Sequence, residues 1–156
     1  MGAKANQVLL VEDALEVVKY RVYPDTPLGE VVDLMVRRGV RALPVVGEYY
    51  EVLGIITTSD ALGDVLSRML RERPAVAPAG SGEEERTARD VMTRAVLCVS
   101  EAQPLADAAR VMVTRSVDQL PVVREGELIG LVTRVATLRA LHEASRHAND
   151  ETKDDS

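Results

Sequence analysis

The stretch that decides the fold is Arg-Ala-Leu-Pro-Val-Val (41–46), followed by the polar loop Gly-Glu-Tyr-Tyr-Glu (47–51) and by Val-Leu-Gly-Ile-Ile-Thr-Thr-Ser-Asp (52–60). Two short apolar runs separated by a glycine-containing loop predict a pair of strands. Residues 57–60 then lead into a helix, so that hydroxyls and a carboxylate stand beside the free N–H groups of a helix start. The stretch therefore predicts a place that can hold a small polar ligand.

The same pattern recurs in the second half of the chain. The Leu-Pro-Val-Val run at 43–46 is repeated at 120–123, an offset of 77 residues. The loop that follows is one residue shorter in the second half, so that Gly54 falls on Gly130. A shared order of helix, hairpin and helix start indicates two copies of one β-α-β-β-α unit. The predicted fold class is therefore α/β (α+β).

Two amphipathic helices are predicted in the first copy. The first begins with Thr26 as its N-cap and Pro27 in its first position, and it ends at Gly39. Its apolar face consists of Leu28, Val31, Val32 and Met35. The second helix begins at Ser59 or Asp60, and its apolar face consists of Leu62, Val65, Leu66, Met69 and Leu70.

Composition excludes several classes of function. The 156 residues carry a formal net charge of −6 and include neither Phe nor Trp, which disfavours nucleic-acid binding. The single cysteine, Cys98, cannot form an internal disulfide, and its apolar surroundings predict a small buried hydrophobe. No apolar run is long enough to span a membrane, and residues 1–6 lack the apolar centre of a signal peptide. A cytoplasmic protein is therefore expected.

The domain boundaries are expected to follow the repeat. The first copy should span residues 8–72 and the second residues 89–145. Between them, residues 73–88 combine small residues, prolines and an acidic patch, a composition typical of a linker. The polar residues 146–156 are expected to form a disordered acidic tail.

These motifs resemble the cystathionine-β-synthase-type (CBS) domain, here as a tandem pair of the kind called a Bateman module. The resemblance is carried by residues 23–28, 41–46 and 54–60 in the first copy and by residues 90–94, 120–123 and 130–133 in the second. It implies two repeats that pack through their sheets about a pseudo-twofold axis. It also implies clefts between the repeats that in many members bind AMP, ADP, ATP or S-adenosylmethionine, and a tendency to form homodimers.

The first copy carries a full set of residue types for an adenosine nucleotide. A ribose diol favours a carboxylate, which accepts from both hydroxyls, and Asp60 occupies the family's ribose position. Phosphate favours hydroxyls and a cation, and the resemblance implicates Thr57, Ser59 and Arg41. It further implies an adenine wall formed by Tyr23, Pro24, Ala42, Leu43 and Pro44. The alternative is that Thr57, Ser59 and Asp60 only cap the helix. If Asp60 binds ribose, Asp60→Ala should weaken nucleotide binding with little loss of stability.

The second copy departs from this pattern. Ala136 stands where the ribose carboxylate is expected, and Asp118 replaces the base found at the Arg41 position. The candidates that remain for a weaker second cleft are Ser100, Gln119, Leu120, Pro121, Thr133 and Arg134. One competent cleft is therefore expected, beside one that is weak, empty or tuned to another ligand.

The leading hypothesis is a stand-alone regulatory module that binds AMP, ADP or ATP chiefly at the first copy. Binding would change the conformation and thereby signal to a regulated protein of unknown identity. The nucleotide would be a regulatory ligand rather than an obligatory cofactor. No residue cluster predicts a metal site or a nucleophile–base pair, so an enzyme is not expected. The alternatives are a ligand-free dimeric interaction scaffold and an S-adenosylmethionine-type ligand.

Overall fold

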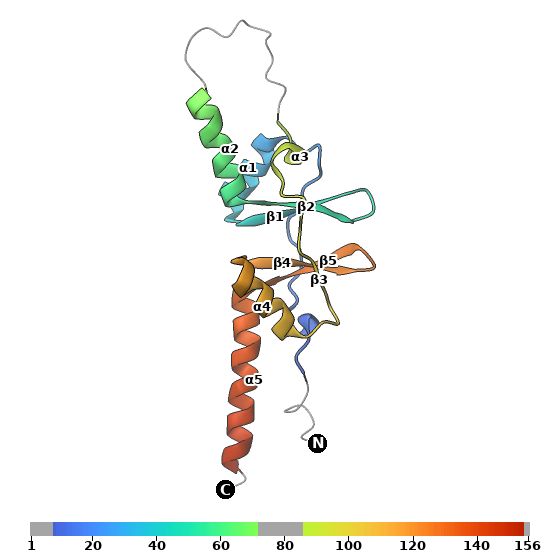
Figure 1. Cartoon of the computed structure of the whole chain (residues 1–156), viewed down its shortest axis with the longest axis vertical. Helices are drawn as coiled ribbons and strands as arrows, with labels where there is room; N and C mark the ends of the chain where they lie inside the picture. The colour runs from blue at the N-terminus through green and yellow to red at the C-terminus, as the bar shows by residue number, and fades with distance from the viewer. Residues whose placement is uncertain (1–7, 72–85, 155–156) are drawn as a thin grey trace, which may run out of the picture. The chain divides into compact units, whose positions relative to one another are not determined.

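The computed structural model describes residues 8–71 and 86–154, with side chains as far as residue 150. Within it the chain divides into a first unit, Lys19–Val96, and a second unit, which comprises Met1–Val18 and Leu97–Ser156. Each unit contains one of the two repeats (Figure 1). Residues 73–85 of the predicted linker lie outside the described residues.

The first unit is built around a two-stranded hairpin. Its elements are α1 (Leu28–Arg38), β1 (Ala42–Val46), β2 (Val52–Thr57), α2 (Thr58–Arg71) and α3 (Ala88–Val91). The strands pair antiparallel, with Ala42 opposite Thr57. Val22, which precedes α1, pairs in parallel with β1. The apolar face predicted for α1 packs on the hairpin through Leu28, Val31 and Met35.

The second unit has the same order of helix, hairpin and helix. Its elements are η2 (Val11–Ala14), β3 (Val99–Ser100), α4 (Leu105–Arg115), β4 (Gln119–Arg124), β5 (Glu127–Thr133) and α5 (Arg134–Asp154). The sheet order is β3-β4-β5, with β3 parallel and β5 antiparallel to β4. The buried core includes Leu105, Ala108 and Met112 of α4 together with apolar residues of both long strands.

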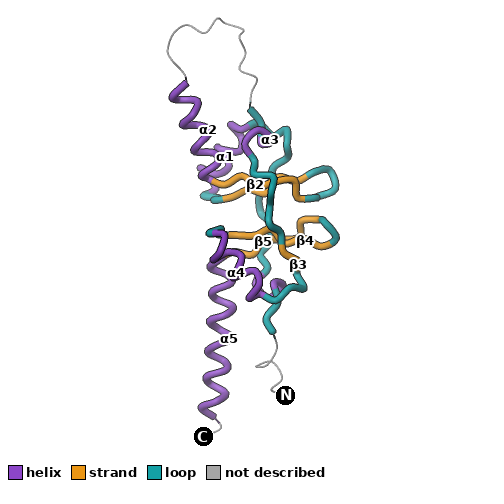
Figure 2. The backbone as a smooth tube through the Cα atoms, viewed as in Figure 1, coloured by secondary structure: helices purple, strands orange, loops and turns teal. Residues whose placement is uncertain are grey.

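The segment that precedes each repeat in the chain packs on the other repeat. The N-terminal segment (residues 8–18) belongs to the second unit, and the middle segment (residues 86–96) belongs to the first. Glu16 exchanges two backbone hydrogen bonds with Leu131 of β5, at 2.8 and 2.9 Å. Thr93 does the same with Ile55 of β2, at 2.8 and 3.0 Å. Apart from the short helices η2 and α3, both segments follow irregular paths rather than strands (Figure 2).

Two glycines make this close approach possible. A Cβ atom on Gly54 would lie 2.9 Å from the carbonyl oxygen of Thr93, and one on Gly130 would lie 2.7 Å from that of Glu16. Both distances are shorter than van der Waals contact, so neither position has room for a side chain. Each repeat therefore needs a glycine at this position, because the segment that crosses its hairpin (the middle segment at Gly54, the N-terminal segment at Gly130) leaves no room for a side chain.

The start of α1 differs from its prediction. Pro27 is the N-cap, and the helix begins at Leu28. Thr26 instead accepts a hydrogen bond at its Oγ1 from the backbone N–H of Tyr23, at 2.9 Å, so its hydroxyl closes the turn that leads into the helix. The predicted end is confirmed, because Gly39 is the C-cap and has a left-handed φ of 63°.

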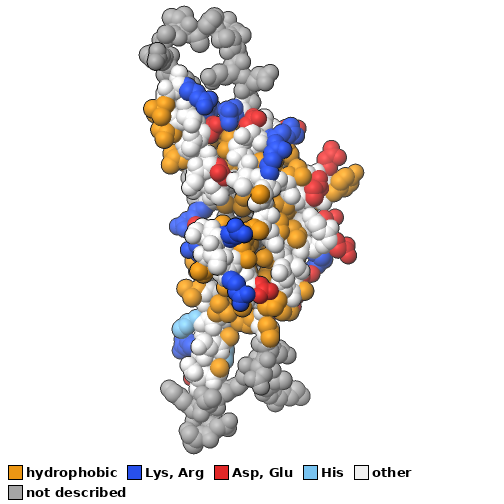
Figure 3. Space-filling model, in the orientation of Figure 1, with side chains coloured by type: hydrophobic (Ala, Val, Ile, Leu, Met, Phe, Trp, Pro, Cys, Tyr) orange, Lys and Arg blue, Asp and Glu red, His pale blue; other side chains and the backbone are white. Residues whose placement is uncertain are grey.

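The apolar face predicted for α2 is exposed. Relative exposures are 69% for Leu62, 52% for Leu66, 67% for Met69 and 76% for Leu70, and Figure 3 shows hydrophobic side chains gathered along this helix. The helix packs instead through Ala61 and Asp64. The Asp64 carboxylate is 8% exposed and forms an ion pair with Arg86 of the middle segment at 2.7 Å. The predicted hydrophobic period is present, but of its five side chains Val65 alone is half-buried and the other four are exposed.

Two further predictions are wrong. The tail predicted to be disordered from residue 146 is helical as far as Asp154, because α5 continues through it (Figure 1). These residues contain no Gly or Pro that would end a helix. Cys98 is exposed rather than buried, although partial loss of solvent contact raises the pKa of its thiol. Among the described residues, no helix combines the length and apolar character needed to cross a bilayer.

Candidate functional site

The start of α2 holds the residues predicted for ribose and phosphate. The Asp60 Oδ2 atom accepts hydrogen bonds from the backbone N–H and the hydroxyl of Thr57, each at 2.9 Å. In return, the Thr57 hydroxyl accepts from the backbone N–H of Asp60 at 3.2 Å. The capping role weighed as an alternative is therefore present. It occupies only one carboxylate oxygen, since Oδ1 of Asp60 makes no hydrogen bond within the described part of the chain.

Thr93 adds a third contact that the sequence did not suggest. Its hydroxyl lies 3.5 Å from the Asp60 Oδ2 atom, to which it donates. The middle segment carries Thr93 across β2 and so brings it to the start of α2. The internal repeat, when extended toward the N-terminus, aligns Thr93 with Glu16 at the same offset of 77 residues. This alignment is the sequence feature that marks residues 16 and 93 as equivalent positions of the two repeats.

Arg41 and Ser59 lie at the same end of the hairpin as Asp60. The carbonyl oxygen of Arg41 accepts from the backbone N–H of Thr58, the first residue of α2, at 2.9 Å. Ser59 follows in the first turn of that helix, and the side chains of Arg41 and Ser59 are exposed. The structure thus gathers a guanidinium, hydroxyls and a carboxylate at one end of the hairpin. The predicted wall residues Ala42, Leu43 and Pro44 follow in β1, where all three are buried.

Tyr23 and Pro24 are not brought to that end. Val22 pairs in parallel with Val45, so the chain after Val22 runs toward the hairpin loop and away from Ala42. The Pro24 carbonyl accepts from the backbone N–H of Arg89 at 3.0 Å. The separation arises because the strand direction, which the spacing of the motif does not reveal, decides where these two residues lie.

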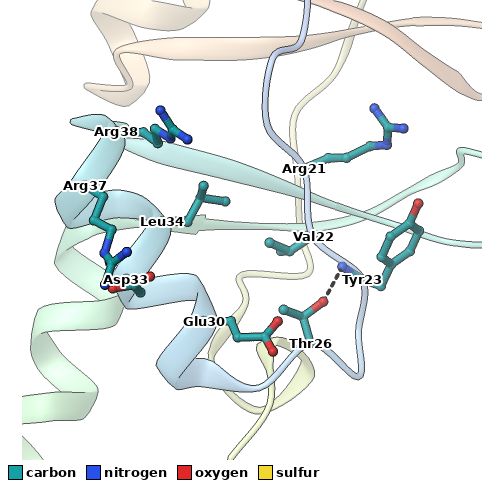
Figure 4. Close-up of a pocket in the computed structure, with 9 residues that line it drawn as sticks. All are labelled: Arg21, Val22, Tyr23, Thr26, Glu30, Asp33, Leu34, Arg37 and Arg38. Atoms are coloured by element: carbon teal, nitrogen blue, oxygen red, sulfur yellow. Dashed lines mark hydrogen bonds and ion pairs between the residues drawn. The ribbon is translucent and has the colours of Figure 1, made fainter.

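Tyr23 instead lines a separate pocket beside α1, with a volume of about 460 Å³ (Figure 4). Its other lining residues are Arg21, Val22, Thr26, Glu30, Asp33, Leu34, Arg37 and Arg38. Its three cations already have partners, since Arg38 lies over the Tyr20 ring at 6.0 Å. Arg37 pairs with Asp33 at 2.9 Å, and Arg21 stacks on the Tyr50 ring at 4.5 Å and donates to its hydroxyl.

In the second unit, the predicted residues divide into two groups. Gln119 pairs with Thr133 across the hairpin, next to the start of α5. The Thr133 hydroxyl accepts from the backbone N–H of Ala136 at 3.1 Å and so caps that helix. Leu120 and Pro121 are buried in β4. Ser100 lies apart from them, since it pairs with Val123 toward the far end of β4.

The charge of Arg134 is engaged within the second unit. Its Nε donates to the Val117 carbonyl at 2.9 Å, and its Nη2 donates to the Met112 carbonyl at 3.0 Å. The same guanidinium lies 3.4 Å from the Asp118 carboxylate. Arg134 therefore stabilises the end of α4 and neutralises Asp118, which leaves little of its charge for a phosphate. Throughout the described residues, no group of His, Cys, Asp and Glu is arranged to hold a metal ion.

Comparisons with known proteins connect both halves of the chain to one family. A family model described as the CBS domain matches residues 11–73 and 88–143. An uncharacterized 33.4 kDa protein in the ribosomal RNA operon of Thermofilum pendens is 32% identical over 151 residues, which cover 89% of this chain and 46% of that protein. The uncharacterized protein MJ1426 of Methanocaldococcus jannaschii is 30% identical, and the match covers 87% of this chain and 93% of that protein.

Solved structures share the fold. CBSX2 in complex with AMP has a TM-score of 0.69 and 27% identity, covering 87% of this chain and 98% of that chain; CBSX2 is a CBS-pair protein from Arabidopsis thaliana. The CBS domain pair of protein MJ0100, in complex with 5′-methylthioadenosine and S-adenosyl-L-methionine, has a TM-score of 0.65 and 22% identity over 88% of this chain and 98% of that chain. These matches confirm the predicted fold class and the tandem repeat.

Proposed function

Because the chain belongs to the CBS domain family, we propose that it is a regulatory module that binds an adenosine nucleotide at the start of α2. Asp60 would accept the ribose hydroxyls through its Oδ1 atom, and Ser59 and Arg41 would bind phosphate, while the Thr57 hydroxyl, whose proton is donated to Asp60, would hold that carboxylate in place. The observation that carries the proposal is that Asp60 is fixed by hydrogen bonds to one oxygen while the other makes none among the described residues. The AMP complex of CBSX2 supports the choice of ligand.

The test is a thermal-shift series with AMP, ADP, ATP and S-adenosylmethionine. A ligand that binds only the folded protein adds about 2.7 kcal/mol of stability at 100 times its Kd, which raises the Tm by several degrees. We expect such a rise with at least one of the three nucleotides, and GTP at equal concentration is the control. A rise with S-adenosylmethionine alone would identify an adenosyl ligand without phosphate, and no rise with any of the four would favour the ligand-free scaffold.

We further propose that the module acts as a homodimer and that ligand binding changes its conformation for a partner protein to detect. The exposed apolar side of α2 supports the choice of interface, because a second copy would shield Leu62, Leu66, Met69 and Leu70 from water. Leu138 of α5, which the repeat aligns with Leu62, is also 69% exposed.

Leu66→Asp is expected to convert the dimer into a monomer, since it places a charge in an apolar contact. Size-exclusion chromatography with light scattering measures this as a halving of the mass. Val36→Asp is the matched control, because Val36 of α1 is 76% exposed and lies outside the α2 face. A parent protein with the mass of one chain, or a Leu66→Asp protein that still has the mass of two, would contradict the proposed dimer.

A further inference from the structure

The first unit leaves one edge of its sheet open beside α1. Val22 pairs with β1 on the side opposite β2, because its N–H donates to the Pro44 carbonyl and its own carbonyl accepts from the Val46 N–H, each at 3.0 Å. Successive residues of an extended chain direct their backbone groups to opposite edges. The N–H and the carbonyl of Arg21 therefore face away from β1, and within the described part of the chain neither forms a hydrogen bond.

The pocket of about 460 Å³ lies between this edge and α1 (Figure 4). Its volume falls in the range of known ligand pockets, about 300–1,000 Å³. Val22, which is buried, and Leu34, which is half-buried, provide its apolar surface, one from each wall. The pocket thus combines backbone groups on one wall with a small apolar area between the walls.

The two ends of the pocket carry opposite charges. Figure 4 shows Glu30 and Thr26 at one end and Arg38, the last residue of α1, at the other. Among the described residues, the Glu30 carboxylate has no hydrogen bond or ion pair. The Arg38 guanidinium lies over the Tyr20 ring, a contact that leaves its N–H groups without an acceptor in the same described part. Both charges can therefore bind a ligand without breaking an existing ion pair.

The spacing of these charges determines the length of a ligand that reaches both. Glu30 and Arg38 are separated by two turns of α1, or about 12 Å at a rise of ~1.5 Å per residue. An extended peptide rises ~3.4 Å per residue and covers this distance with about three to four residues. A free amino acid carries its ammonium and its carboxylate on the same carbon, so it cannot reach both ends.

The chain direction determines how such a peptide would lie. Tyr23 belongs to the turn that leads into α1, so the open edge runs toward Glu30 and α1 returns toward Arg38. A peptide with its ammonium at Glu30 and its carboxylate at Arg38 therefore runs antiparallel to this edge. In an antiparallel pair, a residue exchanges both of its backbone hydrogen bonds with the residue opposite. Arg21 offers the N–H and the carbonyl for that exchange.

We propose that this pocket binds a free oligopeptide of about three or four residues with small apolar side chains, added as an antiparallel strand at Arg21. Glu30 and the Thr26 hydroxyl bind its terminal ammonium, and Arg38 binds its terminal carboxylate. The residues proposed above for ribose and phosphate do not line this pocket, so the inference stands or falls independently of nucleotide binding.

The test is an NMR titration of the ¹⁵N-labelled protein with the tetrapeptide Ala-Val-Val-Ala. The peptide is used with free ends, with an acetylated N-terminus and with an amidated C-terminus. The free form should shift the backbone amide signal of Arg21, because that N–H gains an acceptor. Each blocked form should bind roughly 3- to 10-fold more weakly, the size expected when one partly exposed charge contact is lost.

Two variants assign the two ends. Glu30→Gln should bind the free and the acetylated peptide equally while it still prefers the free carboxylate to the amide. Arg38→Gln should show the reverse. Glu48→Gln and Arg71→Gln are the matched controls, because both change exposed residues of the same unit that lie outside the pocket, and both should keep the two preferences of the parent protein.

The outcomes are separate from those of the nucleotide experiments. If the free tetrapeptide does not bind, if the Arg21 amide signal does not move, or if the three forms bind equally, the peptide site is wrong even when AMP binds normally. Preferences that persist in Glu30→Gln and Arg38→Gln would also overturn it. Glu30 and Arg38 are exposed, and the Tm of each variant, measured without ligand, shows that the protein remains folded.

Discussion

Asp60→Asn is expected to lower the affinity for AMP by roughly 10- to 100-fold, because it replaces a charged acceptor of the ribose hydroxyls with a neutral one. The fold should be almost unaffected. Asparagine retains an oxygen that can accept from the Thr57 N–H, as Asp60 does at 2.9 Å, and the Thr57 hydroxyl still caps the helix by accepting from the N–H of residue 60. Calorimetric titration with AMP gives the affinity, and urea unfolding gives the stability.

Asp25→Asn is the matched control for this experiment. Asp25 belongs to the same unit, is exposed and forms an ion pair with Arg89 at 3.2 Å, so the change in net charge is equal but remote from the start of α2. Equal AMP affinity in the Asp60→Asn and Asp25→Asn proteins would remove Asp60 from the site. Asp60→Ala is less informative, because it also removes the carboxylate that accepts from the Thr57 N–H in the capping box, which should cost about 1 kcal/mol of stability.

The sequence was sufficient for the elements whose signals are local. The Leu-Pro-Val-Val runs became β1 and β4, and Thr57 and Asp60 lie beside each other because they are three residues apart at one helix start. The end of α1 at Gly39 was also predictable, because a glycine in the left-handed conformation ends a helix without contacts from elsewhere in the chain.

The parts that could not be predicted depend on distant contacts. An amphipathic period shows that α2 has an apolar side but not which side meets the core, because that depends on distant contacts such as the ion pair between Asp64 and Arg86. Likewise, the motif that contains Tyr23 does not reveal that the preceding residue runs parallel to β1, which takes Tyr23 away from Asp60. The approach of Glu16 to Thr133 joins residues from opposite ends of the chain.

Gly54→Ala and Gly130→Ala are each expected to destabilise the protein by about 1–3 kcal/mol, the usual cost of an extra carbon in a packed site. The Cβ added at Gly54 would lie 2.9 Å from the carbonyl oxygen of Thr93 in the middle segment. The Cβ added at Gly130 would lie 2.7 Å from that of Glu16 in the N-terminal segment. A backbone held by hydrogen bonds on both sides cannot rotate away as a side chain can. The free energy of unfolding, measured in urea, gives the size of the effect.

Gly63→Ala provides the opposite result in the same fold. Gly63 lies inside α2, and a Cβ atom there would meet nothing within 4 Å, so the substitution should stabilise the helix by roughly 0.5–1 kcal/mol. If Gly54→Ala were as stable as Gly63→Ala, the middle segment could not lie across β2 as described. If Gly130→Ala were as stable as Gly63→Ala, the N-terminal segment could not lie against β5 as the hydrogen bonds between Glu16 and Leu131 require.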